Sequence, residues 1–347
     1  MSTASQALKK HLEQGFTLFE MLLVIALIGI LLLIADMGNI IRLNTTYYQA
    51  RQEANNRKIA AALLQHARTN TTQGFLSNPY TGGGYYSTIL DPSDTTLAQM
   101  FRSANLPPAE LNSDGSSGAN VRVYQTVTLT ESIPLDFRSG PLTTITYQYG
   151  EVHLTACMLS NSCNRSPLPG ASTALTAANY KTWTTTAPDL PPTLFSTREI
   201  QKQMLAATSE RLAMIRDQAI ARVNVRRLSA DAADTTNWYP YSYATGAPTT
   251  PSPNMAGSDA SVNQGCWDGW YQLNAANVNI LPQLGLTAAQ YGITAWGARI
   301  EYCRDYDPAL RGANSLPHYA ALRINMNVSQ ALPPNNTLQS DNLFITF

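Results

Sequence analysis

Residues 16–35 read FTLFEMLLVIALIGILLLIA, and only one of these side chains is ionisable, that of Glu20. A helix of roughly 20 apolar residues, rising about 1.5 Å per residue, crosses a bilayer's hydrocarbon core of about 30 Å. The stretch therefore predicts a membrane-spanning helix. A carboxylate without a counter-charge inside lipid costs at least about 2 kcal/mol, so Glu20 predicts a function and a cationic partner.

The residues before this stretch form a polar leader that ends in glycine. Lys9 and Lys10 precede Gly15, and their charge favours a cytoplasmic N-terminus with everything after Asp36 across the membrane. Cleavage between Gly15 and Phe16 would create an α-amino cation about one helical turn from Glu20. A secretory signal differs, because it has a shorter apolar core and is cleaved after that core. The other alternative to a leader cleaved at Gly15 is a plain signal anchor, an uncleaved membrane helix in which Glu20 would have no role.

The sequence GFTLFEMLLVIALIGIL at 15–31 resembles the class III signal of type IV pilins and pseudopilins. The shared features are a basic leader, a glycine, an apolar first mature residue and a glutamate as the fifth. The resemblance implies that prepilin peptidase cleaves after Gly15 and methylates the amino group of Phe16. It also implies that Glu20 pairs with the amino terminus of a neighbouring subunit, since a close counter-charge compensates a buried charge. The family's helix-kinking proline is absent, and Met37-Gly38-Asn39 stands in that region, so the place of any local melting is left open.

The same resemblance implies partners and a location. The partners are other pilin or minor pilin subunits, prepilin peptidase and the inner-membrane assembly platform. The protein is expected to be single-pass in the bacterial inner membrane through residues 16–38 before assembly, and in the periplasm and a cell-surface pilus afterwards.

Charge and cysteine content agree with an exported domain. Lys+Arg and Asp+Glu number 23 each, so net charge gives no argument for nucleic acid as a partner. The four cysteines, Cys157, Cys163, Cys266 and Cys303, all follow the membrane segment, where an oxidising compartment permits disulfides. Of the three possible pairings we favour Cys157 with Cys163 and Cys266 with Cys303, because each pair lies within one predicted domain. Zinc is the competing interpretation, but the cysteines lack ligand spacing.

The predicted fold class is α+β and pilin-like: a long N-terminal helix packed on antiparallel sheet. Residues 40–69 contain neither proline nor glycine, so the membrane helix is expected to continue to about Ala67, with Ile59, Leu63 and Ala67 on its packing face. A membrane anchor followed by a separate helix is the alternative. The predicted divisions are a leader (1–15), the transmembrane and spine helix (16–70), a first globular domain (71–165), a linker or long loop (166–195) and a second helix-plus-sheet domain (196–347).

Within these divisions, alternating apolar residues predict strands at 121–129, 144–149 and 151–157. A second helix is expected to start at a capping box, Ser196 to Glu199, and to end near Leu228. Its apolar stripe is interrupted by Gln201 and Arg222. Further strands are expected at 266–271, 296–303, 319–328 and 342–347. One larger elaborated head is the alternative to two modules.

Catalysis is not expected, nor is a cofactor or a metal. The histidines at 11, 66, 153 and 318 lie in isolated contexts without a nucleophile or phosphate-binding motif. Asp305-Tyr306-Asp307 lacks the spaced ligands of a calcium loop and is interpreted as a solvated turn.

Size and Glu20 together indicate a role. A repeated shaft subunit must stack closely, which a second module hinders, so the chain is interpreted as a minor pilin at or near the filament tip, acting in pilus assembly or initiation. The alternatives are a minor pseudopilin of type II secretion and a tip binding module for adhesion or DNA uptake. The largest pseudopilin of that family usually lacks the glutamate, so Glu20 favours a subunit with a neighbour.

For binding, the candidates are Arg226 and Arg227 for DNA and a set of aromatics whose alternative is core packing: Trp238, Tyr239, Tyr241, Tyr243, Trp267, Trp270 and Tyr271.

Overall fold

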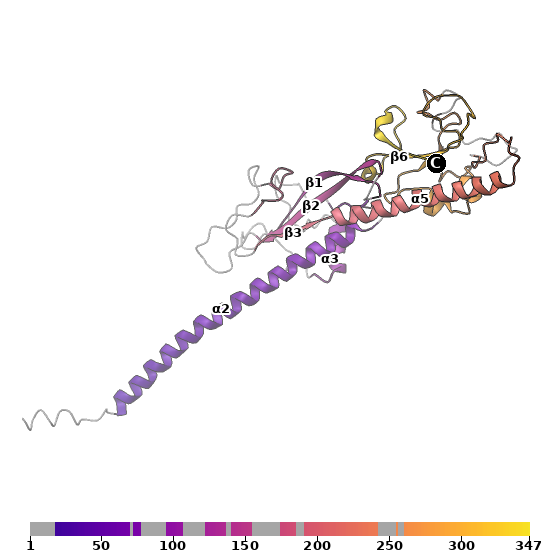
Figure 1. The fold of residues 1–347 in the computed structure, drawn as a ribbon. Helices are drawn as coiled ribbons and strands as arrows, with labels where there is room; N and C mark the ends of the chain where they lie inside the picture. Colours follow the sequence, from indigo (N-terminus) through magenta and orange to yellow (C-terminus); the bar gives the residue numbers. More distant parts are fainter. Residues whose placement is uncertain are drawn as a thin grey trace, which may run out of the picture.

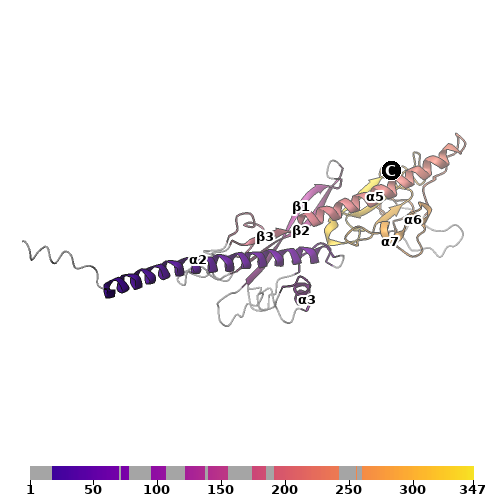
Figure 2. The same ribbon diagram turned by 90° about the horizontal axis from the view of Figure 1, so that it is seen from below.

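The protein is α+β, with a long N-terminal helix and two antiparallel sheets, an architecture consistent with the predicted pilin-like fold. A computed structural model describes residues 18–69, 72–77, 95–106, 122–136, 140–154, 174–184, 191–241, 255 and 260–347. Figures 1 and 2 show helix α2 projecting from one end of the head and helix α5 continuing toward the other end. The molecule is therefore elongated, with the second sheet far from the start of α2.

Helix α2 (Leu18–Ala67) is a single helix of 50 residues, which confirms the continuous helix expected from the sequence. It stays helical through Met37-Gly38-Asn39. Its first half is apolar all round and exposed, whereas Ile59, Leu63 and Ala67 at its other end are fully buried. The helix thus changes from a membrane-type surface to a face that packs on the head.

The first sheet has the order β1 (Arg122–Pro134), β2 (Leu142–Leu154), β3 (Thr193–Ser196). Tyr124, Val152 and Phe195 pack from this sheet onto α2 and the short helix α3 (Thr95–Ser103). Strand β3 lies at the end of the segment expected to be a linker or loop, which therefore contributes to the sheet.

The separate strands predicted at 144–149 and 151–157 are wrong as a division, because β2 runs through Gly150 without interruption. A Cβ at Gly150 would lie 2.8 Å from the ring of Phe195. This glycine therefore permits a close approach between β2 and β3 and does not mark a turn.

Helix α5 (Arg198–Leu228) ends where the sequence predicts, but the capping box is wrong. Ser196 is the last residue of β3, and the N-cap is Thr197. The Thr197 hydroxyl faces the sheet instead of the helix, since the Gln148 N–H donates to its oxygen at 2.9 Å. Ser196 therefore pairs with Tyr149 in the sheet, although its Oγ still accepts from the Arg198 N–H at 3.1 Å.

The polar residue Gln201 interrupts the apolar stripe of α5 in sequence but is fully buried in the structure. Its amide nitrogen donates to the Gln73 carbonyl at 3.0 Å, and its oxygen accepts from Trp296 Nε1 at 2.6 Å. Satisfied at both ends, this side chain joins α5 to two other segments.

The second sheet has the order β4 (Tyr271–Gln272), β5 (Glu301–Cys303), β6 (Ala321–Asn325), β7 (Asn342–Thr346). Strands β5, β6 and β7 lie within predicted strands but are shorter, whereas β4 overlaps its predicted strand only at Tyr271. A turn around Gly297, whose φ is 88°, occupies the first part of the segment expected at 296–303. The remaining short elements are α6 (Ile280–Gln283), α7 (Ala288–Tyr291), η1 (Val328–Gln330) and η2 (Gln339–Asp341).

The two sheets share one hydrophobic core. Ile145 of β2 belongs to the same buried cluster as Leu212 of α5 and Leu322 of β6. A hydrogen bond also joins the two regions, since the Thr146 N–H of β2 donates to Ser329 Oγ, which follows β6, at 2.8 Å. The second sheet is therefore packed directly against the first and not held on a free tether.

Candidate functional site

The membrane half of α2 is the first candidate site. Leu22, Ile28 and Leu31 are each at least half exposed, and the other large apolar side chains around them are exposed too. A helix that is apolar on every side requires lipid or other helices around it. In the described part of the chain, α2 is the helix that is long and apolar enough to cross a membrane.

Glu20 lies in the first turn of α2. A carboxylate in this position is favoured by the partial positive charge of the helix N-terminus. Gly15 and Phe16, the predicted cleavage residues, lie outside the described residues. The structure therefore places Glu20 at the helix start, and the cleavage and pairing roles of these three residues stay predictions.

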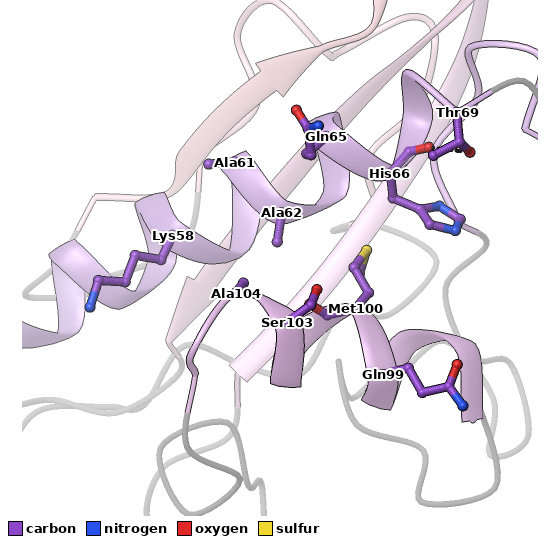
Figure 3. A pocket seen from close by; sticks show the side chains of 10 residues that line it. All are labelled: Lys58, Ala61, Ala62, Gln65, His66, Thr69, Gln99, Met100, Ser103 and Ala104. Atoms are coloured by element: carbon purple, nitrogen blue, oxygen red, sulfur yellow. Dashed lines mark hydrogen bonds between the residues drawn. The ribbon is translucent and has the colours of Figure 1, made fainter.

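A groove of about 760 Å³ lies where α2 reaches the head (Figure 3). Lys58, Ala62 and His66 line it from α2, and Met100 and Ser103 line it from α3. Small side chains on its α2 wall let another chain segment approach the helix closely. The groove is lined by the C-terminal part of the same helix that carries the membrane segment.

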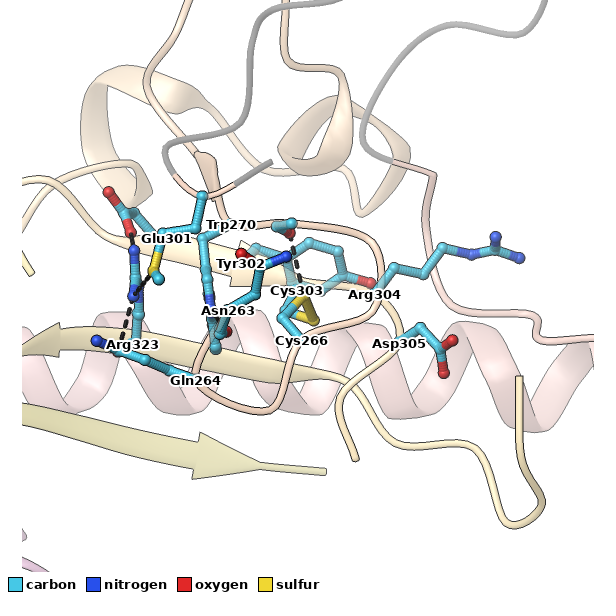
Figure 4. Close-up of a disulfide and its surroundings, with 12 residues drawn as sticks. Asn263, Gln264, Cys266, Trp270, Glu301, Tyr302, Cys303, Arg304, Asp305 and Arg323 are labelled. Atoms are coloured by element: carbon cyan, nitrogen blue, oxygen red, sulfur yellow. Dashed lines mark hydrogen bonds and ion pairs between the residues drawn. A yellow bond between two sulfur atoms is a disulfide. The ribbon is translucent and has the colours of Figure 1, made fainter. Parts of the chain in front are cut away.

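The disulfide between Cys266 and Cys303 lies in the second sheet region (Figure 4). This is one of the two pairings favoured from the sequence; Cys157 and Cys163 lie outside the described residues. Beside the disulfide, the fully buried Arg323 stacks on the Trp270 ring at 4.6 Å and pairs with Glu301 at 2.6 Å. The disulfide therefore stabilises a packed interior.

Three of the seven aromatic residues proposed for binding are buried in the head. Trp270, Tyr271 and Tyr239 are buried, as the core-packing alternative expects. Trp238 and Trp267 are partly buried, and Tyr243 lies outside the described residues. Tyr241 is exposed, and its ring stacks on the Arg304 guanidinium at 3.6 Å. The sequence shows aromatic clustering but not which side of the sheet each ring occupies.

The histidines that the structure describes lie apart. His66 lines the α2–α3 groove, His153 is buried in β2, and His318 hydrogen-bonds the Thr235 carbonyl at 2.7 Å. His11 lies outside the described residues.

The carboxylates of Asp305 and Asp307 bind backbone amides. Asp307 accepts from the Arg311 and Ala309 N–H groups, and Asp305 accepts from the Asn314 N–H. Both side chains are buried, so this is an ordered turn and not the solvated one expected. Among the described residues, no group of three His, Cys, Asp or Glu side chains could hold a metal ion.

A buried polar cluster in the first sheet was missed from the sequence. Glu151 has no exposed surface, and its carboxylate lies 2.8 Å from His153 Nδ1 and accepts from Gln125 Nε2 at 2.7 Å. Burial raises the pKa of the Glu151 carboxyl. The alternation of β2 is the signal available, because it places residues 151 and 153 on the same face.

Comparison with known proteins identifies the N-terminal segment. Residues 10–35 match the prokaryotic N-terminal methylation motif, and this range includes Gly15, Phe16 and Glu20. The chain matches no curated protein and no solved structure. The motif is the class III signal peptide of type IV pilins and pseudopilins, so the N-terminal segment of this chain is similar to theirs.

Proposed function

We propose that this protein is a minor pilin of a type IV pilus, incorporated at or near the filament tip and acting in pilus assembly or initiation. The observation that carries the proposal is the position of the second sheet, at the end of the head away from the membrane helix (Figure 1). A shaft subunit needs room for further subunits around and above its head. This elongated head occupies that room, which suits a subunit near the end of the filament.

Assembly is driven, in this proposal, by the exposed apolar half of α2. After prepilin peptidase cleaves behind Gly15 and methylates Phe16, the new amino terminus is a cation at the start of the helix. Glu20 of one subunit then pairs with the amino terminus of a neighbour inside the helix bundle. The pair compensates two charges that would otherwise each be costly in an apolar surrounding.

Glu20 also bears on the position within the tip. A subunit that pairs through this carboxylate needs a neighbour whose amino terminus reaches it, so we place the protein within a tip complex and not as its outermost cap. The same signal serves minor pseudopilins of type II secretion, which is the alternative system for the same assembly chemistry.

The test is a Glu20→Ala variant in cells that assemble filaments, with Glu13→Ala as the matched control, because Glu13 lies in the leader that cleavage removes. We expect both variants to lose residues 1–15 and to insert in the membrane. Sheared filaments should contain roughly tenfold less Glu20→Ala protein, since one lost charge pairing of about 1.4 kcal/mol is a tenfold change. Immunoblots of sheared filaments and membranes measure this. Wild-type levels of Glu20→Ala in filaments would refute the pairing, and loss of secretion instead of pili would identify the alternative system.

A further inference from the structure

A second pocket, of about 540 Å³, opens on the first sheet. Its walls come from both long strands, from the 174–184 segment and from the start of α5: Glu131, Tyr147, Tyr149, Tyr180, Lys181 and Arg198. Strand side chains alternate between faces, and Tyr124 and Val152 point toward α2. Tyr147 and Tyr149 are odd-numbered residues of β2, so they lie on the face turned away from α2.

Three tyrosine rings form the apolar part of this pocket. The rings of Tyr149 and Tyr180 meet edge to face, with centroids 5.3 Å apart. Tyr147 is nearly buried, and burial together with the neighbouring Tyr180 raises the pKa of its hydroxyl. Each ring presents an apolar surface with a hydroxyl at one end, so the pocket offers stacking and hydrogen bonding together.

The charged side chains at the pocket are largely balanced. Arg198 donates two hydrogen bonds to the Glu131 carboxylate, each 2.6 Å long, and this pairing lowers the pKa of Glu131. Glu199 lies within 3.6 Å of both Arg198 and Lys202. The Lys181 ammonium lies 5.6 Å from the centre of the Tyr180 ring. The bidentate pair holds planar donor and acceptor groups in a fixed geometry without a large net charge.

We infer that this pocket binds a neutral pyranose ring. The C–H faces of a sugar stack on aromatic rings, and its hydroxyls bond to fixed carboxylate and guanidinium groups. The volume is in the range of small-ligand sites, which are lined by aromatic side chains and a few placed polar groups. Because the site faces away from α2, assembly through that helix leaves it open. This binding goes beyond the assembly role and does not depend on it.

The test uses the full-length protein in an amine-oxide detergent, because alkyl glycoside detergents would themselves present a sugar. The probes are methyl glucopyranoside, methyl galactopyranoside, N-acetylglucosamine, lactose and cellobiose, titrated by calorimetry up to about 50 mM, as befits millimolar affinity. We expect saturable binding of at least one probe. If the disaccharides bind more tightly than the monosaccharides, the natural ligand is a sugar within a glycan chain. If both kinds of probe bind with equal affinity, the natural ligand is a free sugar.

Variants show whether this pocket is the site. Tyr149→Ala should weaken binding about tenfold, and Tyr149→Phe, which keeps the ring, should stay within about threefold of wild type. Tyr319→Ala removes a partly exposed tyrosine of the second sheet region and should bind as wild type does. Glu131→Gln unbalances the ion pair with little change of shape and should also weaken binding, which covers the case that Tyr149→Ala fails to fold. The inference is overturned if no probe binds saturably, or if folded Tyr149→Ala and Glu131→Gln both bind like wild type.

Discussion

Glu151 carries a carboxyl group with no exposed surface near the C-terminal end of β2, facing His153 on its own strand and Gln125 on β1. Burial is the largest influence on it and raises its pKa. A group whose pKa is raised by folding favours the folded state in its protonated form. Its contribution to stability is therefore full at low pH and is lost as pH rises through the folded pKa.

Glu151→Gln keeps the shape and hydrogen-bonding capacity of this side chain but removes the ionisation. We expect the melting temperature of the variant to exceed that of wild type by an amount that grows between about pH 4 and about pH 8. Thermal unfolding followed by circular dichroism measures it. Glu53→Gln, at a partly exposed position on α2, is the control and should show no such growth. A constant or shrinking difference for Glu151→Gln would mean that the raised pKa of Glu151 does not govern this pH dependence.

At the scale of elements, Gly150 sets how closely β2 and β3 pack. A Cβ there would meet Phe195 at 2.8 Å and Leu76 at 3.1 Å, both in the core beneath α2. Gly150→Ala should therefore force these side chains apart and destabilise the head by roughly 1–3 kcal/mol. Gly38→Ala in α2 is the matched control, because a Cβ there meets nothing within 4 Å.

Chemical denaturation of both proteins, followed by tryptophan emission, compares their free energies of unfolding. All five tryptophans lie in or near the head, so the signal reports on the region that Gly150 affects. An unfolding free energy of Gly150→Ala equal to that of wild type would show that the ring of Phe195 moves aside without cost.

The same elements show what the sequence can and cannot predict. Helices α2 and α5 were predictable because each is a long run of residues that favour a helix, with few residues that favour a turn or strand. Their predicted C-terminal ends agree with the structure. The start of α5 was not, since Ser196 pairs in β3 with a residue far away in sequence. The prediction that β2 is divided at Gly150 was wrong for the same reason. A glycine is needed there because the ring of Phe195 lies close to it, and the local sequence does not reveal that contact.

The candidate sites divide in the same way. Glu20 and the glycine before the membrane stretch stand in a contiguous motif, which a single sequence displays in full. The tyrosine pocket and the Glu151 cluster assemble from β1, β2 and later segments, and only strand register brings them together. Burial of Trp270 likewise depends on Arg323, which stacks against it from strand β6.

At the scale of the whole molecule, the two sheets do not separate cleanly. Ile145 of the first sheet is fully buried in the cluster that holds α5 and the second sheet. Removal of residues 196–347 would expose this side chain and delete the hydroxyl of Ser329, which accepts from the Thr146 N–H. Such a truncation would damage the first sheet, so point variants in the full chain are better tests of the distal part.

Ile145→Ala tests whether the head unfolds as one unit. Truncation of a buried isoleucine should cost roughly 2–5 kcal/mol. If the shared core couples the sheets, native-state hydrogen exchange should show the free energy of opening falling equally for the slowest amides of β2 and of β6. Leu228→Ala, at an exposed position on α5, should leave both unchanged. A loss confined to β1 and β2 would mean that the second sheet is an independent module whose contact with the first contributes little to stability, and the tip would then be a separable domain on the assembly helix.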